Sequence, residues 1–268
     1  MSIQFMSLAS GSSGNCYYVS TREGALLIDA GIATRTIRKH LTNNRLPMEH
    51  IHAVLVTHDH ADHIKGLPGL GEGLHIPIYA TAATHRGIAQ NYCTRQKPLD
   101  TSAHTLIPGQ PFKLAGFQIE AFTLPHDSQD CVGYSLKADG RHLVFMTDLG
   151  HIPDHAFPYI STADYLVLEA NYDEEMLQRG PYPAYLKARI ASSTGHLSNR
   201  QAATLLDQHF PSRLRHLWLC HLSRENNCPK QAEECITAIL RQHLPPHEMP
   251  VMVEALQRTS PSPLYELT

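Results

Sequence analysis

The most constraining feature of the sequence is a polar cluster that directly follows an apolar run. Residues 53–56 are all apolar and predict a buried β-strand that ends just before the cluster. The cluster contains His58, Asp59, His60, Asp62 and His63. Neutral imidazoles and carboxylates are the ligands that suit zinc, manganese or iron. The pattern therefore favours a metal site in a loop between a strand and a helix, with a solvated histidine-rich loop as the alternative.

The spacing within the cluster suggests more than one ion. His58 and His60 are two positions apart, so in an extended loop their side chains point to the same side. Asp62 and His63 are adjacent and diverge, so they could serve a second ion.

Composition sets broad limits on the class of protein. The chain has 268 residues, 42% of them hydrophobic, and no Gly- or Ser-rich linker, so we expect one domain over residues 1–268. Residues 256–268 are rich in Ser and Pro and are expected to be loosely ordered. The six cysteines contain no C-x-x-C pair, and no signal peptide or membrane span is recognised. We therefore expect reduced thiols and a cytoplasmic location, without membrane partners.

The charge distribution is uneven, although the net charge is only −3. The stretch from Arg179 to Lys230 contains eight Lys or Arg residues against two acidic residues. This locally basic stretch is compatible with a nucleic-acid partner, but it is equally compatible with a solvated face of helices.

Further candidate ligands follow predicted strands later in the chain. His126, Asp148 and His221 each lie where an apolar strand is expected to end. Ligands delivered from the ends of several strands to one rim build a site on a rigid scaffold. Together with the first cluster, these three residues strengthen the prediction of a metal site.

Two features near the N-terminus have two interpretations each. Asp29 ends a predicted strand and could orient a metal-ligand histidine, or it could cap the helix expected over residues 34–41. Gly11 and Gly14 would let a ligand approach the loop over residues 10–15 closely, but a plain hairpin turn is the simpler explanation.

A third polar feature lies in the C-terminal half. His196 is two residues before a capping box formed by Ser198 and Gln201, which predicts a helix to His209. A helix N-terminus is a natural place for a phosphate group. His196 could equally be a polar residue that flanks a helix.

In chain order, these residues resemble the metallo-β-lactamase superfamily across nearly the whole chain. The resemblance implies an α/β fold, a four-layered αββα sandwich, with a dinuclear metal site at the sheet edges. Shorter motifs over residues 8–15, 27–31, 195–199 and 221–227 resemble the YycJ/WalJ subgroup. That subgroup is described as bacterial cytosolic nucleases that act as 5′-to-3′ exonucleases on DNA.

The resemblance assigns roles to individual residues. It implies two divalent ions, the first held by His58, His60 and His126, the second by Asp62, His63 and His221, with Asp148 bridging both. It makes Asp62, Glu169 and His196 catalytic, and Asp29 a support for the ligands. It places Ser12, Ser13, Asn15, Ser198 and Asn199 at the substrate. It also suggests a homodimer.

Three other functions remain as alternatives. The same metals could hydrolyse a small phosphodiester, thioester or lactone, or the protein could process RNA. Only 72 residues separate Asp148 from His221, which leaves no room for the large additional domain of the β-CASP RNA-processing branch. A metal- or redox-sensing protein without hydrolytic activity is the third alternative.

Overall fold

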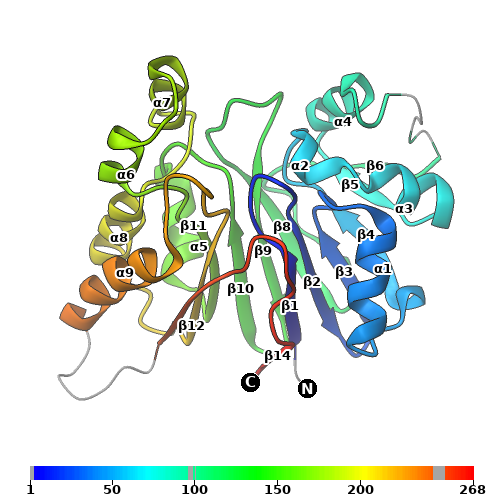
Figure 1. Ribbon diagram of the computed structural model, residues 1–268. Coiled ribbons are helices and arrows are strands. Elements are labelled where there is room, and N and C mark those ends of the chain that lie inside the picture. The colour runs from blue at the N-terminus through cyan, green and yellow to red at the C-terminus, as the bar shows by residue number, and fades with distance from the viewer. Residues whose placement is uncertain (1–2, 96–98, 100, 244–250) are drawn as a thin grey trace. The chain divides into compact units, whose positions relative to one another are not determined.

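The structure is a computed structural model that describes residues 3–95, 99, 101–243 and 251–268 (Figure 1). The chain divides into two compact units. The first consists of Met1–Thr123, Ser128–Gly140 and Gln257–Thr268, and the second of Leu124–Asp127 and Arg141–Leu256.

The first unit contains most of the strands. They are β1 (Ile3–Ala9), β2 (Cys16–Thr21), β3 (Gly24–Ile28), β4 (Ile51–Leu55), β5 (Ile78–Ala80), β6 (Ala103–Thr105), β7 (Phe112–Leu114), β8 (Phe117–Thr123), β9 (Val132–Ala138) and β14 (Tyr265–Leu267). Its helices are α1 (Thr34–Asn43), the 3₁₀ turn η1 (Met48–His50), α2 (Ala61–Ile64), α3 (Leu67–Leu74) and α4 (Ala82–Gln90).

The second unit alternates strands with helices. Its strands are β10 (Arg141–Met146), β11 (Tyr165–Glu169), β12 (His216–Cys220) and β13 (Met252–Ala255). Its helices are the 3₁₀ turn η2 (Asp154–Ala156), α5 (Phe157–Ser161), α6 (Glu174–Arg179), α7 (Ala184–Ile190), α8 (Asn199–Gln208) and α9 (Pro229–His243). Strands β10 to β13 pair in parallel, and every residue of β11 and β12 is buried. Continuous apolar runs are typical of such strands.

The strands form two seven-stranded sheets, in the orders β14-β1-β2-β3-β4-β5-β6 and β13-β12-β11-β10-β9-β8-β7. In the first unit, β1 to β3 are antiparallel and β3 to β6 are parallel. Because the carboxyl ends of parallel strands meet at one edge of a sheet, the loops after β3 and β4 share an edge. In the second unit, the loops after β10, β11 and β12 share an edge for the same reason. The candidate residues lie in these loops.

Helices α1 and α3 bury their apolar sides in the core of the first unit. Ile37 and Leu41 of α1 and Leu67 and Leu70 of α3 belong to one buried cluster with residues of β3 and β4. Figure 1 shows α1 in blue beside β3 and β4. The helix expected over residues 34–41 is therefore confirmed, and its opposite side is left to solvent.

The expectation of a loosely ordered tail over residues 256–268 is wrong. Tyr265–Leu267 form β14, which pairs antiparallel with β1, and the ring of Tyr265 stacks on that of Phe5. Ser7 donates its backbone N–H to the Ser262 hydroxyl at 3.0 Å. The tail is ordered because it covers the edge of β1, whose backbone groups would otherwise lack partners. Composition alone did not reveal that pairing.

Candidate metal centre

In the first unit, Asp29 joins the loop after β3 to the loop after β4. Thr57 donates its backbone N–H to Asp29 Oδ1 and its hydroxyl to Asp29 Oδ2, each at 2.8 Å. His63 Nδ1 lies 2.7 Å from Asp29 Oδ2, so the ring donates its Nδ1–H to the carboxylate. The N-cap of α1 is Ala33, which has no side-chain cap. Asp29 therefore contacts the loop after β4 and does not cap that helix.

Asp29 is completely buried. Burial raises the pKa of Asp29, and the contacts with His63 and Thr57 offset part of that rise. A buried carboxylate with these partners holds His63 in one tautomer and one orientation, as partners of metal-ligating histidines commonly do.

The three histidines of the sequence cluster lie together. The ring of His58 has its centroid 4.6 Å from that of His60 and 4.1 Å from that of His63. The Thr57 hydroxyl lies 3.0 Å from His58 Nδ1. Thr57 was not singled out by sequence reasoning, although its position directly before His58 is a usable signal.

Asn15 contacts the same loop. Its side-chain nitrogen lies 2.9 Å from His63 Nε2 and 3.3 Å from Asp62 Oδ2. The amide N–H groups thus point at the two atoms that the sequence predicts as metal ligands. The two atoms therefore face one point, as the ligands of a cation do, and a bound cation would replace the amide as the partner of both.

In the second unit, four candidate residues converge at one sheet edge. Ligand atoms of Asp148, Glu169, His196 and His221 all lie within 4.8 Å of one another. His221 Nδ1 is 2.8 Å from Asp148 Oδ1 and 3.0 Å from Glu169 Oε1. These contacts hold the Nδ1 side of His221, so Nε2 is the atom that could bind a metal.

Glu169 orients His196. Its Oε1 atom lies 2.7 Å from His196 Nδ1, and its Oε2 atom accepts the backbone N–H groups of Leu149 and Leu197, each at 3.1 Å. Burial alone would raise the pKa of Glu169, but the charge of His196 and the hydrogen bonds from His196 and His221 bring it below its usual value. Glu169 is therefore a fixed carboxylate.

The pKa of His196 moves in the opposite direction. Burial alone would lower this pKa, but the charge and hydrogen bond of Glu169, with the charge of Asp148, raise it above its usual value. His196 consequently retains a proton at higher pH than an ordinary histidine does.

His126 adds a further imidazole to this unit. Its Nδ1 atom donates to the Gly195 carbonyl oxygen at 2.9 Å, and its Nε2 atom lies 3.9 Å from Asp148 Oδ1. With Nδ1 protonated, Nε2 carries the lone pair that a metal needs. The Gly195 carbonyl is a second orienting group that the sequence did not reveal.

Three site residues have a left-handed backbone. Asp29, Asp148 and His221 have φ values of 57°, 58° and 52°, respectively. Residues other than glycine rarely adopt this conformation, and it clusters at functional sites where surrounding contacts hold it. Each of these residues follows a strand, so the left-handed turn directs its side chain at the point where the strand ends.

The residues predicted to contact substrate have different environments. Ser12 and Ser13 are exposed, whereas Asn15 is buried and contacts Asp62 and His63. Ser198 caps α8 and donates its hydroxyl to Glu174, and Asn199 pairs with Asn227 at 3.0 Å. All five assignments stay predictions.

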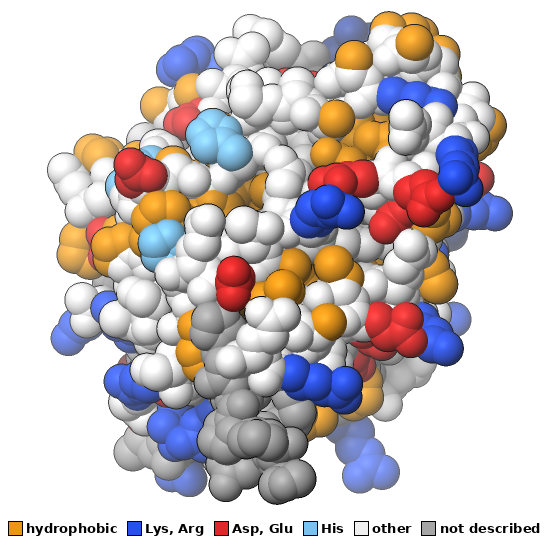
Figure 2. All heavy atoms as spheres, turned by 90° about the vertical axis from the view of Figure 1, so that its left-hand side faces the viewer, with side chains coloured by type: hydrophobic (Ala, Val, Ile, Leu, Met, Phe, Trp, Pro, Cys, Tyr) orange, Lys and Arg blue, Asp and Glu red, His pale blue; other side chains and the backbone are white. Residues whose placement is uncertain are grey.

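The locally basic stretch is mostly neutralised. Six of its eight cations form ion pairs with acidic side chains, namely Arg179, Arg189, Arg200, Arg213, Arg224 and Lys230. In Figure 2, which shows the side of α6 to α9, blue and red side chains lie beside one another. This stretch therefore lacks the uniform positive charge that its sequence suggests.

Two other expectations concern the environment of the chain. All six cysteines lie among the described residues and are free. Across the described ranges, helices that combine the length and apolar character needed to cross a bilayer are absent.

The donor chemistry of both units suits divalent metals. Each unit presents imidazoles whose Nδ1 atoms are held by oxygen atoms, together with carboxylates beside them. Such residues at the ends of parallel strands define a metal-dependent hydrolase.

Comparison with known proteins agrees with this class. The chain matches the beta-lactamase superfamily domain over residues 25–221. It is 33% identical over 242 residues to exodeoxyribonuclease YycJ of Bacillus anthracis, covering 90% of each chain. It is 35% identical over 236 residues to exodeoxyribonuclease WalJ of Streptococcus pneumoniae, covering 88% of this chain and 87% of WalJ.

A similar solved structure is the metallo-β-lactamase-fold protein YhfI of Bacillus subtilis. It has a TM-score of 0.69 and 17% identity and covers 99% of this chain and 100% of YhfI. The match over residues 25–221 and the two relatives above 30% identity show that the chain belongs to the metallo-β-lactamase superfamily. The predicted αββα fold class and the resemblance to YycJ and WalJ are confirmed.

The contact between Asp29 and His63 leads to the first prediction. Asp29→Asn keeps the size of the side chain but removes its charge, so we expect metal affinity to fall about 10- to 100-fold. Asp139→Asn is the matched control, because Asp139 is an exposed aspartate of the same unit with a left-handed backbone, φ 50°. Competition with a chelator measures both affinities, and equal affinity in the two variants would exclude this role for Asp29.

Proposed function

We propose that the protein is a phosphodiesterase that degrades DNA from 5′ ends. The observation that carries this proposal is the Glu169–His196 pair, in which a carboxylate holds a histidine of raised pKa beside Asp148. Phosphodiester cleavage releases an alkoxide, which is a poor leaving group and needs a proton. The two exodeoxyribonuclease relatives support DNA as the substrate.

Two divalent ions, zinc, manganese or iron, complete the proposal. As the family resemblance implies, His58, His60 and His126 would hold the first ion, Asp62, His63 and His221 would hold the second, and Asp148 would serve both. When bound, such ions supply Lewis acidity that activates water and offsets the charge of a phosphodiester. Metal analysis of the purified protein tests the number, and two ions per chain is the expected result.

The residues of the chain position and move protons around these ions. His196 Nδ1 is held by Glu169, so Nε2 is the atom from which a proton would pass to the leaving oxygen. Glu169 keeps the ring oriented and stabilises its protonated form. Asp62 is proposed to act both as a ligand and in catalysis, with its carboxylate held by Asn15.

A cleavage panel tests the substrate class. Metal-loaded protein would be given end-labelled single-stranded DNA, duplex DNA with and without a 5′-phosphate, RNA and bis-p-nitrophenyl phosphate. We expect stepwise loss of nucleotides from 5′ ends of DNA. RNA cleavage alone would instead favour RNA processing, and intact DNA and RNA in every reaction would refute a nuclease.

A small phosphodiester, thioester or lactone is the second candidate substrate. The ion pairs of the stretch from Arg179 to Lys230 favour it, because paired cations attract a polyanion weakly. Turnover of bis-p-nitrophenyl phosphate without cleavage of any nucleic acid would support this candidate. The homodimer and the cytoplasmic location also stay proposals, and light scattering tests the first.

A further inference from the structure

The exposed side of α1 is positively charged and carries no acidic residue of its own. Arg35, Arg38 and Lys39 of α1 and Arg45 just beyond it are all exposed. Residues 30–48 contain no acidic residue. Among the residues that the structure describes, these four cations have no ion-pair partner. We call Arg35, Arg38, Lys39 and Arg45 the α1 cations.

The surroundings of His40 agree with this charge balance. Burial and the charge of Lys39 both lower the pKa of His40, and no carboxylate acts on it in the opposite direction. The α1 cations therefore differ from those of the stretch from Arg179 to Lys230, where six of eight cations are paired. Four unpaired cations are therefore grouped on and just beyond one helix, outside the stretch that the sequence suggested.

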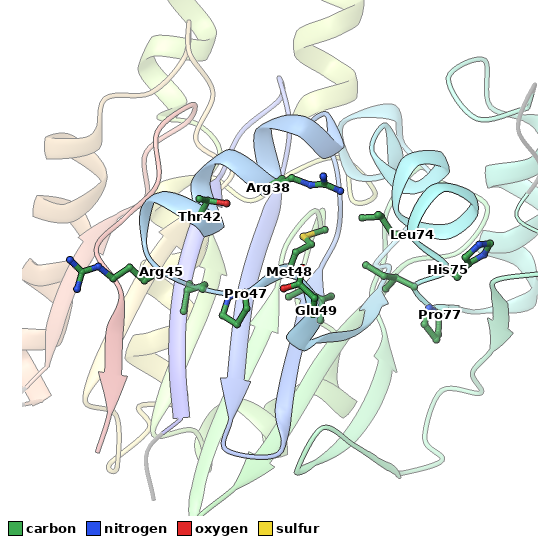
Figure 3. Close-up of a pocket in the computed structure, with 12 residues that line it drawn as sticks. Arg38, Thr42, Arg45, Pro47, Met48, Glu49, Leu74, His75 and Pro77 are labelled. Carbon is green, nitrogen blue, oxygen red and sulfur yellow. The ribbon is translucent and has the colours of Figure 1, made fainter.

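The surface beside α1 is hollowed on both sides of Arg38. One cavity of about 620 Å³ is lined by Arg38, Thr42 and Arg45, together with residues of η1 and residues 74–77 (Figure 3). A second of about 510 Å³ is lined only by residues of α1, including Arg35 and Lys39. Glu49 is the acidic residue that lines the first cavity.

The α1 cations are spread along the helix and do not converge on one point. Figure 3 shows Arg38 extending toward Leu74, whereas Arg45 points away in the opposite direction. A small anion needs converging donors, but a chain of phosphates can meet charges one after another. The arrangement therefore fits an extended polyanion better than a single phosphate.

The start of α1 is hydrogen-bonded to Gly66, which follows α2 and its candidate ligands Asp62 and His63. Thr34 donates its hydroxyl to the Gly66 carbonyl oxygen at 3.0 Å, and Gly66 donates its N–H to Ala30 at 2.6 Å. A Cβ atom on Gly31 would overlap the Asp62 carbonyl oxygen, so only glycine allows this close approach. The segment that leads into α1 thus lies against Asp62, and the α1 cations follow it along the chain.

We propose that the α1 cations bind the phosphate backbone of the nucleic-acid substrate beyond the nucleotide being removed. This inference rests on the proposed nuclease function. The ten residues of α1 span about 15 Å, and this length corresponds to roughly four steps of about 3.4 Å along a DNA strand. The α1 cations would hold a long substrate without taking part in the chemistry.

The test compares two triple variants with the same change in net charge. Arg35→Gln, Arg38→Gln and Lys39→Gln remove three α1 cations. Arg179→Gln, Arg224→Gln and Lys230→Gln remove three exposed cations of the second unit that are already paired. Metal-loaded protein would be titrated with a DNA duplex of about 20 base pairs, which is much longer than α1. The 5′-terminal linkages of this duplex would be phosphorothioates, which resist cleavage.

We expect the α1 variant to bind this duplex about tenfold more weakly or worse. The plot of the log of the association constant against the log of the salt concentration should become less steep by about 3. The control variant should bind as wild type does. Turnover of bis-p-nitrophenyl phosphate and of a dinucleotide, which has no phosphate beyond the linkage being cleaved, should be unchanged in both variants.

Three outcomes would overturn the inference. Unchanged binding and salt slope in the α1 variant would remove the α1 cations from the DNA path while leaving the nuclease function intact. Equal losses in both variants would assign the effect to net charge. Wild-type protein that neither binds nor cleaves nucleic acid would refute the proposed function and this inference together.

Discussion

Replacing Asp148 should abolish hydrolysis while the chain still folds. Asp148 Oδ1 lies 2.8 Å from His221 Nδ1, 3.6 Å from His196 Nδ1 and 3.9 Å from His126 Nε2. Loss of this carboxylate removes the anion that these three imidazoles share and the ligand proposed to serve both metals. We expect kcat/KM to fall at least about 10³-fold, because groups that act as a unit lose most of their effect when one is removed.

The choice of substitution separates chemistry from folding. Asp148 has a left-handed backbone, which asparagine tolerates better than alanine does, so Asp148→Asn is the first variant and Asp148→Ala the second. Asp154→Ala, an exposed aspartate of the same unit, is the control. Thermal unfolding, metal content and cleavage rate would be measured together. Full activity in a folded Asp148→Asn protein would rule out a central role for Asp148.

The sequence predicted the positions of the candidate ligands well, because strands end where apolar runs end. The loops after β4, β10 and β12 carry His58, Asp148 and His221 as expected. The backbone conformation of these loops was not predictable, since a left-handed aspartate or histidine looks like any other in a sequence. Thr57 and the Gly195 carbonyl were missed because their role depends on contacts with residues distant in sequence.

The charge of the surface was the least predictable property. Arg189 pairs with Asp127, and Arg213 pairs with Asp164, partners that lie 62 and 49 positions away. A local count of charged residues cannot include such partners. The sequence around α1 is basic too, but a count of residues does not show which of them share one face, and only burial of Ile37 and Leu41 shows which side of α1 faces solvent.

The second large effect is expected from His196→Ala. If His196 donates a proton to the leaving oxygen, its loss should lower kcat on DNA about 10²- to 10⁴-fold and leave metal content unchanged. The loss should be much smaller with a p-nitrophenyl ester, because p-nitrophenolate leaves without a proton. His151→Ala is the matched control, since His151 is an exposed histidine of the same unit whose Nδ1 donates to the Ser193 carbonyl oxygen at 2.8 Å.

Glu169→Gln separates proton donation from a merely structural role. The proton donor must be protonated, so activity should decline as pH rises through the pKa of His196. Glu169 raises that pKa, and removing its charge should move the alkaline limb of kcat to lower pH. A pH–rate profile on DNA measures the shift. Two results would contradict proton donation by His196: an alkaline limb of kcat that does not move in Glu169→Gln, and an equal loss of activity in His196→Ala on DNA and on the p-nitrophenyl ester. Either result would mean that His196 positions the substrate and that the proton comes from elsewhere.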